Sequence, residues 1–147
     1  MASYHFHLTQ VKRSRGQSVI AQAAYRSGEK LYSTYYGESS DFTRKRGVVM
    51  AEICLPDHAP REYANRETLW NALEWAEHGR KAQLAHSFDI TLMNEFSMEE
   101  NIEMARAFVR EELVSRGMIA DFAIHDPVRP KGAEPNPHIH ILVPIRP

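Results

Sequence analysis

Two histidines near the C-terminus, His138 and His140, have the spacing best suited to chemistry in this chain of 147 residues. The segment around them is rich in Ile, Leu and Val and is typical of a β-strand. Side chains two positions apart on a strand lie on one face of the sheet, so both imidazoles can reach the same divalent ion. Ile139 and Ile141 would point to the other face, into the core. The pair therefore predicts a metal site on a sheet.

A third histidine, His125, would complete this site. It comes just before a loop at 126–137 that is rich in Pro and Gly. If the strands on either side of this loop are antiparallel, His125 lies beside His138 and His140. Three neutral imidazoles leave coordination positions open for a substrate oxygen, as a catalytic metal requires.

A His-x-His pair alone is a weak pattern, because this chain has a second one, His5 and His7. That pair has no third histidine near it in the sequence. We interpret it as part of the first strand and leave open whether it faces the site. His58 lies in a loop bounded by prolines and His78 at a predicted helix end, so we interpret both as exposed.

The second candidate is Tyr25, which follows Ala23 and Ala24 and precedes Arg26. Small alanines let a helix lie close to a sheet, so Tyr25 would project from a closely packed surface. A tyrosine can act as a nucleophile and form a covalent intermediate. Because a free phenol has a pKa of about 10, it needs a base, a metal or nearby cations. An ordinary core or surface tyrosine is the alternative interpretation.

The third candidate is an aromatic and basic stretch over residues 32–46. Rings interleaved with cations suit single-stranded nucleic acid, because rings stack on bases and cations contact phosphates. A solvated loop anchored by a few aromatic residues explains the same composition. The cations predicted to contact DNA are Arg13, Arg15, Arg26, Arg44, Lys45 and Arg46.

Composition limits the class of protein. The length fits one domain, and 43% hydrophobic with 25% charged residues fits a folded chain. The single cysteine, Cys54, excludes a disulfide framework and a cysteine-based zinc cluster. Without a membrane-length apolar run or a signal-peptide pattern, we expect a soluble, cytoplasmic protein. The net charge is −1, but the first 50 residues hold eight Lys or Arg against three Asp or Glu, which allows a cationic DNA-binding surface.

The pattern of apolar residues predicts the elements that position these candidates. Ser18 is a candidate N-cap, and Ser97 with Glu100 matches a capping box. The order of elements indicates an α+β domain with one open sheet and helices on one face. Strands are predicted at 3–11, 48–55, 85–92, 119–124 and 138–145, helices at 19–30, 62–80 and 97–116, and an irregular arm or small hairpin at 32–46.

Taken together, these residues resemble the MobA/MobL family of plasmid relaxases. Each matching stretch is short, but the stretches follow the family's order and cover nearly the whole chain. They are Tyr4-His5-Phe6, Ala23-Ala24-Tyr25-Arg26-Ser27-Gly28-Glu29-Lys30-Leu31, Tyr35-Tyr36-Gly37-Glu38, Asp41-Phe42-Thr43, Leu69-Trp70-Asn71-Ala72, Ala82-Gln83-Leu84-Ala85 and Asn136-Pro137-His138-Ile139-His140.

The resemblance implies a histidine–hydrophobe–histidine endonuclease that nicks one DNA strand at an origin of transfer through a 5′-phosphotyrosyl intermediate, which initiates plasmid mobilization. Tyr25 matches the family's nucleophile, and His125, His138 and His140 match its metal ligands. The implied fold is the relaxase fold of rolling-circle-type nucleases, a central antiparallel sheet of about five strands with helices packed on it. The ion expected in function is Mg²⁺ or Mn²⁺, although three nitrogen ligands also suit Zn²⁺ or Ni²⁺ in a crystal.

Some members of the family have two glutamates, two positions apart, on the strand that matches 85–92, where this chain has Ser87 and Asp89. Asp89 is therefore the candidate for a carboxylate that orients a histidine or accepts a proton, with Asp126 as the other. Relatives continue beyond the His-x-His strand, so we expect residues 1–147 to be a relaxase catalytic domain that is truncated relative to them.

The implied partners are single-stranded origin DNA, accessory mobilization proteins and a coupling protein. The implied location is the cytoplasm of a bacterium that carries the plasmid or mobile element. Two alternatives stay open: a non-catalytic module that binds origin DNA, and another histidine-metal phosphoesterase, which would need no tyrosine.

Overall fold

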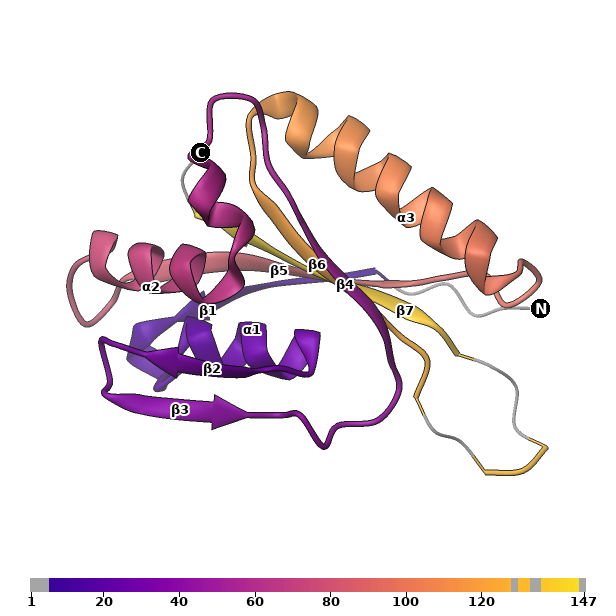
Figure 1. Ribbon diagram of the computed structural model, residues 1–147, viewed down its shortest axis with the longest axis horizontal. Coiled ribbons are helices and arrows are strands. Elements are labelled where there is room, and N and C mark those ends of the chain that lie inside the picture. The colour runs from indigo at the N-terminus through magenta and orange to yellow at the C-terminus, as the bar shows by residue number, and fades with distance from the viewer. Residues whose placement is uncertain (1–5, 128–129, 133–135, 146–147) are drawn as a thin grey trace.

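A five-stranded antiparallel sheet forms the centre of the fold and confirms the predicted class (Figure 1). The computed structural model describes residues 6–127, 130–132 and 136–145, so His5 and the predicted strand start at residues 3–5 lie outside the described residues. The last strand in the sequence lies between two others, which fixes it from both sides. In spatial order the strands are β1 (Phe6–Lys12), β5 (Gln83–Thr91), β7 (His138–Pro144), β6 (Ala120–His125) and β4 (Val48–Cys54).

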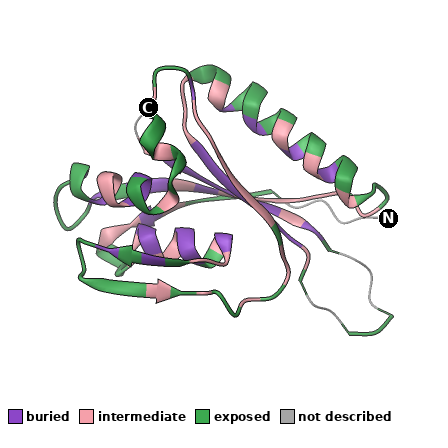
Figure 2. Cartoon of the chain, in the orientation of Figure 1, coloured by how far each residue is buried: buried purple, intermediate pink, exposed green. Residues whose placement is uncertain are grey.

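Helices cover both faces of the sheet, so the prediction of helices on one face was wrong. Helices α1 (Val19–Ser27) and α2 (Arg66–Ala76) pack on one face, and α3 (Met98–Glu112) packs on the other (Figure 1). In Figure 2, α3 is exposed along its outer side and buried where it faces the sheet. Strands β6 and β7 are buried on both sides of the sheet, and such strands need cover on both sides.

Alternation along β7 sorts its side chains between these faces. Ile139 and Ile141 are buried in the cluster that includes Val109 of α3, as predicted. Leu142 is buried in the other cluster, with Ala23 of α1. Because alternate residues of a strand share a face, the two histidines of β7 lie on the α1 side.

Helix α1 begins as predicted and ends earlier than predicted. The Ser18 side chain accepts a hydrogen bond from the Ala21 N–H at 3.2 Å, which is an N-cap. The helix ends at Gly28, whose φ of +71° is unfavourable for a residue with a side chain. The chain then forms a two-stranded sheet of β2 (Lys30–Ser33) and β3 (Glu38–Asp41), which is the small hairpin that the sequence allowed.

The other two predicted helices are each divided into an α-helix and a short 3-10 helix. Asn65 separates η2 (Arg61–Ala64) from α2, because its side chain accepts from the Thr68 N–H and caps α2. The predicted capping box of Ser97 is present at the start of α3. Beyond α3 lies η3 (Val114–Arg116). None of the helices in the described part of the chain combines the length and apolarity needed to cross a bilayer.

Two buried ion pairs hold α2 in place. Asp121 on β6 accepts hydrogen bonds from Arg66 Nε at 2.8 Å and from Trp70 Nε1 at 2.7 Å. Arg13 donates to Glu74 Oε2 at 2.6 Å and also to main-chain oxygens at the end of α2. Both pairs are almost fully buried, so each charge depends on its partner.

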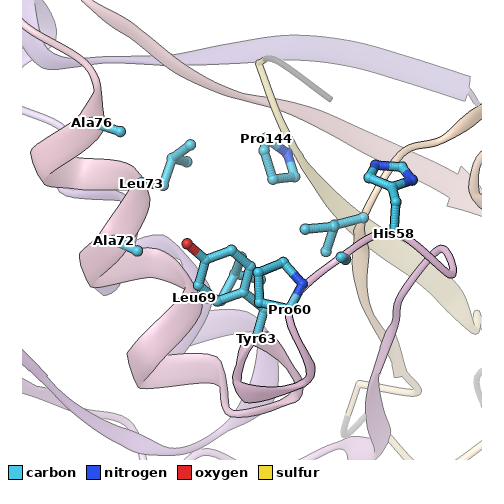
Figure 3. A pocket seen from close by; sticks show the side chains of 10 residues that line it. His58, Pro60, Tyr63, Leu69, Ala72, Leu73, Ala76 and Pro144 are labelled. Atoms are coloured by element: carbon cyan, nitrogen blue, oxygen red, sulfur yellow. The ribbon is translucent and has the colours of Figure 1, made fainter.

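An apolar pocket of about 200 Å³ lies between η2, α2 and the far end of β7 (Figure 3). Pro60, Leu69, Leu73 and Pro144 line it. Pro144 is six residues beyond His138 on an extended strand, which corresponds to about 20 Å. This pocket is therefore separate from the histidine pair.

Candidate active site

Strand register brings the three predicted histidines together. His125 is directly opposite His138 in the pairing of β6 with β7, and Asp89 is opposite His140 in the pairing of β5 with β7. The ring centroids of His125 and His140 are 4.3 Å apart, and those of His138 and His140 are 5.6 Å apart. The expected antiparallel pairing across the 126–137 loop is thus confirmed, and two neighbouring strands supply one cluster of imidazoles.

Burial keeps two of these histidines neutral. Burial lowers the pKa of His125 to about 4. Burial, and then the charge of the neighbouring His140, also lower the pKa of His138. His125 Nε2 lies 2.6 Å from the main-chain oxygen of Arg26, so this nitrogen carries the proton and Nδ1 does not. His138 Nδ1 is buried and has no hydrogen-bond partner among the described residues. Neutral imidazole is the form that binds metal ions.

Asp89 orients the third histidine. Its Oδ1 lies 2.5 Å from His140 Nδ1, and because a carboxylate only accepts, Nδ1 carries the proton and Nε2 is left for a ligand. Burial opposes ionisation of Asp89, but the hydrogen bond to His140 and the charge of Arg26 outweigh it and lower its pKa. His7 is opposite Asp89 in the pairing of β1 with β5, so His7 is on the same face.

Ser87 and Asp126, which the sequence analysis also considered for this site, have different surroundings. Ser87 Oγ accepts a hydrogen bond from the Arg26 guanidinium at 2.7 Å, so this residue helps to hold α1 on the sheet. The main-chain N–H of Asp126 donates to the Gly47 carbonyl at 2.8 Å. The charge of Asp126 acts on His138, where it opposes the lowering of the pKa.

Tyr25 projects from the last turn of α1 and is about half exposed. The edge of its ring meets Phe42 at a centroid distance of 5.3 Å. Lys45 Nζ lies 3.4 Å from the ring centroid and donates to the Tyr25 main-chain oxygen at 2.8 Å. The next residue, Arg26, bonds to His125 through its main-chain oxygen. The predicted nucleophile is therefore held one residue from a contact with the histidine cluster, with a cation over its ring.

Lys45 is expected to titrate near pH 8. Burial, and then the charge of Arg26, lowers its pKa to about 8, whereas a free lysine has a pKa of about 10.4. Between these two pH values the folded chain binds fewer protons than the unfolded chain, so this group makes the free energy of unfolding rise with pH. Below pH 8 Lys45 is charged in both states, and the destabilisation from burying that charge is fully present. An NMR titration of the lysine ammonium signals checks this, with the Lys45→Arg variant to assign the signal. A midpoint above pH 10 would contradict the prediction.

The six cations predicted to contact DNA differ in their accessibility. The side chain of Arg13 is buried against α2, and Arg26 is held by Gln22 and Ser87, so both stabilise the fold. Lys45 lies over Tyr25 rather than in open solvent. The contacts of Phe42 and Lys45 with Tyr25 were not foreseen, although both residues belong to motifs that the sequence singled out. The exposed cations are Arg15, Arg44 and Arg46.

The histidine cluster is not a preformed metal cage. Within residues 6–127, 130–132 and 136–145, no group of three or more His, Cys, Asp or Glu side chains is arranged to hold a metal ion as it stands. One reason is the bond between His125 Nε2 and the Arg26 carbonyl, which keeps that nitrogen from serving as a ligand. In the neutral rings, this hydrogen bond and the one between His140 and Asp89 leave His125 Nδ1 and His140 Nε2 as the nitrogens that can bind a ligand.

Comparison with known proteins identifies the group to which this architecture belongs. The model of the MobA/MobL family matches residues 17–147. The probable mobilization protein MobA of Bifidobacterium longum (strain NCC 2705) is 36% identical over 143 residues, which are 97% of this chain and 25% of that protein. The conjugal transfer protein TraA of Agrobacterium fabrum (strain C58) is 35% identical over 157 residues, which cover 100% of this chain and 14% of that protein. The chain thus spans a quarter or less of the length of these two relatives.

A solved structure described as the molecular basis of vancomycin resistance transfer in Staphylococcus aureus has the same fold. It matches with a TM-score of 0.89 at 35% sequence identity, over 99% of this chain and 72% of that chain. The sheet and its helices therefore have an established architecture. From the family match over residues 17–147 together with this shared fold, we conclude that the chain belongs to the MobA/MobL family of mobilization relaxases.

Proposed function

We propose that this chain is the nicking domain of a plasmid relaxase, in which Tyr25 attacks one strand of DNA at an origin of transfer. The observation that carries the proposal is the 2.6 Å contact between His125 Nε2 and the main-chain oxygen of Arg26. It joins the histidine cluster to the residue that follows Tyr25. An accessible phenol and a group of imidazoles thus lie on one face of the sheet, as phosphoryl transfer to a tyrosine requires.

In the proposed reaction, a bond forms between Tyr25 Oη and phosphorus while the bond between phosphorus and O3′ breaks. The phenol loses one proton and the leaving O3′ gains one, so the products are a 5′-phosphotyrosyl strand and a free 3′-hydroxyl. The ester preserves the energy of the phosphodiester, which allows rejoining without ATP. Lys45 and Phe42 hold the Tyr25 ring, and this lowers the entropy lost when the phenol aligns with the phosphate.

The histidine cluster fits a divalent ion, which His125, His138 and His140 would hold. The supporting observations are the buried His138 Nδ1 with no described partner, the neutral state of His125 and the carboxylate that orients His140. When bound, Mg²⁺ or Mn²⁺ polarises a scissile phosphate and neutralises charge in the transition state. Binding through His125 Nε2 would require this nitrogen to leave the Arg26 carbonyl.

Formation of a metal-dependent covalent adduct tests the proposal. The protein is incubated with Mn²⁺ and a pool of 3′-labelled single-stranded oligonucleotides that have a randomised central region. We expect a labelled species that survives SDS and does not form when EDTA is present during the reaction. Mass spectrometry should place the DNA on the peptide that contains Tyr25. Cleavage without an adduct would favour a histidine-metal phosphoesterase, and binding without cleavage would favour a non-catalytic DNA-binding module.

In this proposal residues 1–147 supply the nicking activity in the cytoplasm. Accessory mobilization proteins and a coupling protein would act on the same origin DNA. Their presence in an origin-relaxation assay should change the site or yield of nicking but not the residue that carries the DNA.

A further inference from the structure

A pocket of about 750 Å³ lies at the tip of the β2–β3 hairpin. It lies between η1 (Arg13–Arg15), the turn that joins β2 to β3 and the loop between α2 and β5. Figure 1 shows this turn and this loop at the same end of the molecule, opposite the start of β7. We call it the tip pocket, and the lining residues that matter here are Arg13, Tyr35, Tyr36, Gly79, Arg80 and Lys81.

Aromatic rings form a continuous group at the tip pocket. Tyr35 is in edge contact with Trp75 at a centroid distance of 5.0 Å and with Tyr36 at 4.9 Å. All three residues are exposed, with 37%, 39% and 54% of the surface of Tyr35, Tyr36 and Trp75 accessible. An edge contact covers at most one face of a ring, so Tyr36 and Trp75, each with one such contact, keep a face that can stack on a planar group.

These rings are held in place before any ligand binds. Arg13 lies over the Tyr35 ring at 4.4 Å, and Arg13 itself is fixed by its buried pair with Glu74. Trp75 Nε1 donates to Thr34 Oγ1 at 2.7 Å, which ties α2 to the hairpin turn. A surface with fixed aromatic side chains loses little conformational entropy on binding, which favours stacking.

The rim of the tip pocket is cationic. Arg80 and Lys81 are exposed, and neither has an ion pair among the described residues of the chain. Glu74, whose charge acts on Tyr36, is buried and neutralised by Arg13. A planar, anionic ligand matches both features, and single-stranded DNA combines stacking bases with phosphates. We propose that the tip pocket binds single-stranded DNA, with one base on Tyr36, which lines the pocket, another on Trp75, which adjoins the pocket through Tyr35, and phosphates near Arg80 and Lys81.

This inference rests on the proposed function for the identity of the nucleic acid and adds a second contact for the same strand. One hairpin connects the two sites, because Phe42 just after β3 contacts Tyr25 and Tyr36 just before β3 lines the tip pocket. The four extended residues of β3, which span about 13 Å, and the turn residue Gly37 separate Phe42 from Tyr36. A strand held in the tip pocket would therefore be fixed at a set distance from the nucleophile, which helps to choose the phosphate that is cut.

Binding of fluorescein-labelled dT20 in EDTA, measured by anisotropy, tests the tip pocket without metal or cleavage. We expect Tyr36→Ala to weaken binding about 5- to 150-fold, the usual range for loss of one stacked base. Tyr36→Phe, which keeps the ring, should bind like the wild type. The double variant Arg80→Ala/Lys81→Ala should reduce the slope of log K against log salt by about 1.4, because each lost phosphate contact on a single strand contributes about 0.7.

Two controls make the result specific. Phe108→Ala removes an aromatic residue of similar exposure from α3, on the other face of the sheet, and should leave the affinity unchanged. The emission of the exposed Trp75 should be quenched by dT20 in the wild type and not in Trp75→Phe, whose remaining Trp70 is fully buried. The circular dichroism spectrum and thermal midpoint of each variant establish that it is folded.

Affinity for dT20 within twofold of the wild type in both Tyr36→Ala and Arg80→Ala/Lys81→Ala would overturn the inference. Equal losses of affinity for dT20 and for a dT20–dA20 duplex would also overturn it, because a duplex hides its base faces. The outcome is independent of the proposed function. If the chain forms the Tyr25 adduct but the variants bind dT20 as tightly as the wild type, only the tip-pocket inference is rejected. If the variants lose affinity for dT20 as expected but no adduct forms, only the proposed nicking activity is rejected.

Discussion

Replacement of Tyr25 by phenylalanine is expected to abolish the SDS-resistant adduct and to lower the rate of strand cleavage by at least about 10³-fold, because the variant has no oxygen to bond to phosphorus. The substitution is otherwise conservative. Phenylalanine keeps the ring that contacts Phe42 and lies under Lys45, and the Tyr25 side chain donates no hydrogen bond that the fold depends on among the described contacts. The loss should therefore appear in catalysis and not in folding or in DNA binding.

The measurement is a time course of labelled oligonucleotide cleavage with Mn²⁺, quenched in SDS and resolved on a denaturing gel. Tyr63→Phe is the matched control, because Tyr63 lies in η2 at the apolar pocket of Figure 3, outside the histidine cluster. It should cleave DNA and form the adduct at the wild-type rate. If Tyr25→Phe cleaved DNA at an undiminished rate, water would be the nucleophile and the relaxase mechanism would be wrong for this chain.

Much of the fold was predictable because local patterns determine it. Alternating apolar residues located the strands, and the caps at Ser18 and Ser97 located two helix starts. The prediction of helices on one face was wrong, because alternation along β5 does not show what covers each side. Its polar positions Ser87 and Asp89 lie under α1, where Arg26 and His140 satisfy them, and Phe88 packs on the α3 side. Alternation shows that the two sides of a strand differ in polarity, and it does not show whether the polar side meets water or a site.

The histidine cluster was predictable for a different reason. His125 and His138 bound a single loop, so antiparallel pairing of the two strands was enough to bring them together. The contact of Lys45 with Tyr25 was not predictable, because it depends on how the hairpin folds back onto α1. The tip pocket was harder still, since η1, a hairpin turn and the loop after α2 each contribute to it. Spacing along the chain carries no information about contacts that depend on how three separate segments pack.

The largest effect on stability is expected for Asp121→Ala, which should reduce the free energy of unfolding by about 3–5 kcal/mol. Asp121 is buried and accepts hydrogen bonds from Arg66 Nε and Trp70 Nε1. Its removal leaves a buried guanidinium with only the partly exposed Glu29 as a partner and leaves the indole N–H without an acceptor. Domains have total stabilities of about 5–15 kcal/mol, so the change is large. It also loosens α2, which carries Trp75, the neighbour of Tyr35, and Glu74, the partner of Arg13.

Urea denaturation followed by tryptophan fluorescence and circular dichroism gives the free energy of unfolding for wild type and variants. The matched control is Glu112→Ala, which breaks the exposed pair between Glu112 and Arg116 and should change stability by no more than about 0.5 kcal/mol. Trp70→Phe removes the indole donor but keeps an aromatic ring in the core, so it should cost less than Asp121→Ala. A loss below about 1 kcal/mol in Asp121→Ala would mean that Glu29 and water replace the carboxylate, and that this pair does not anchor α2.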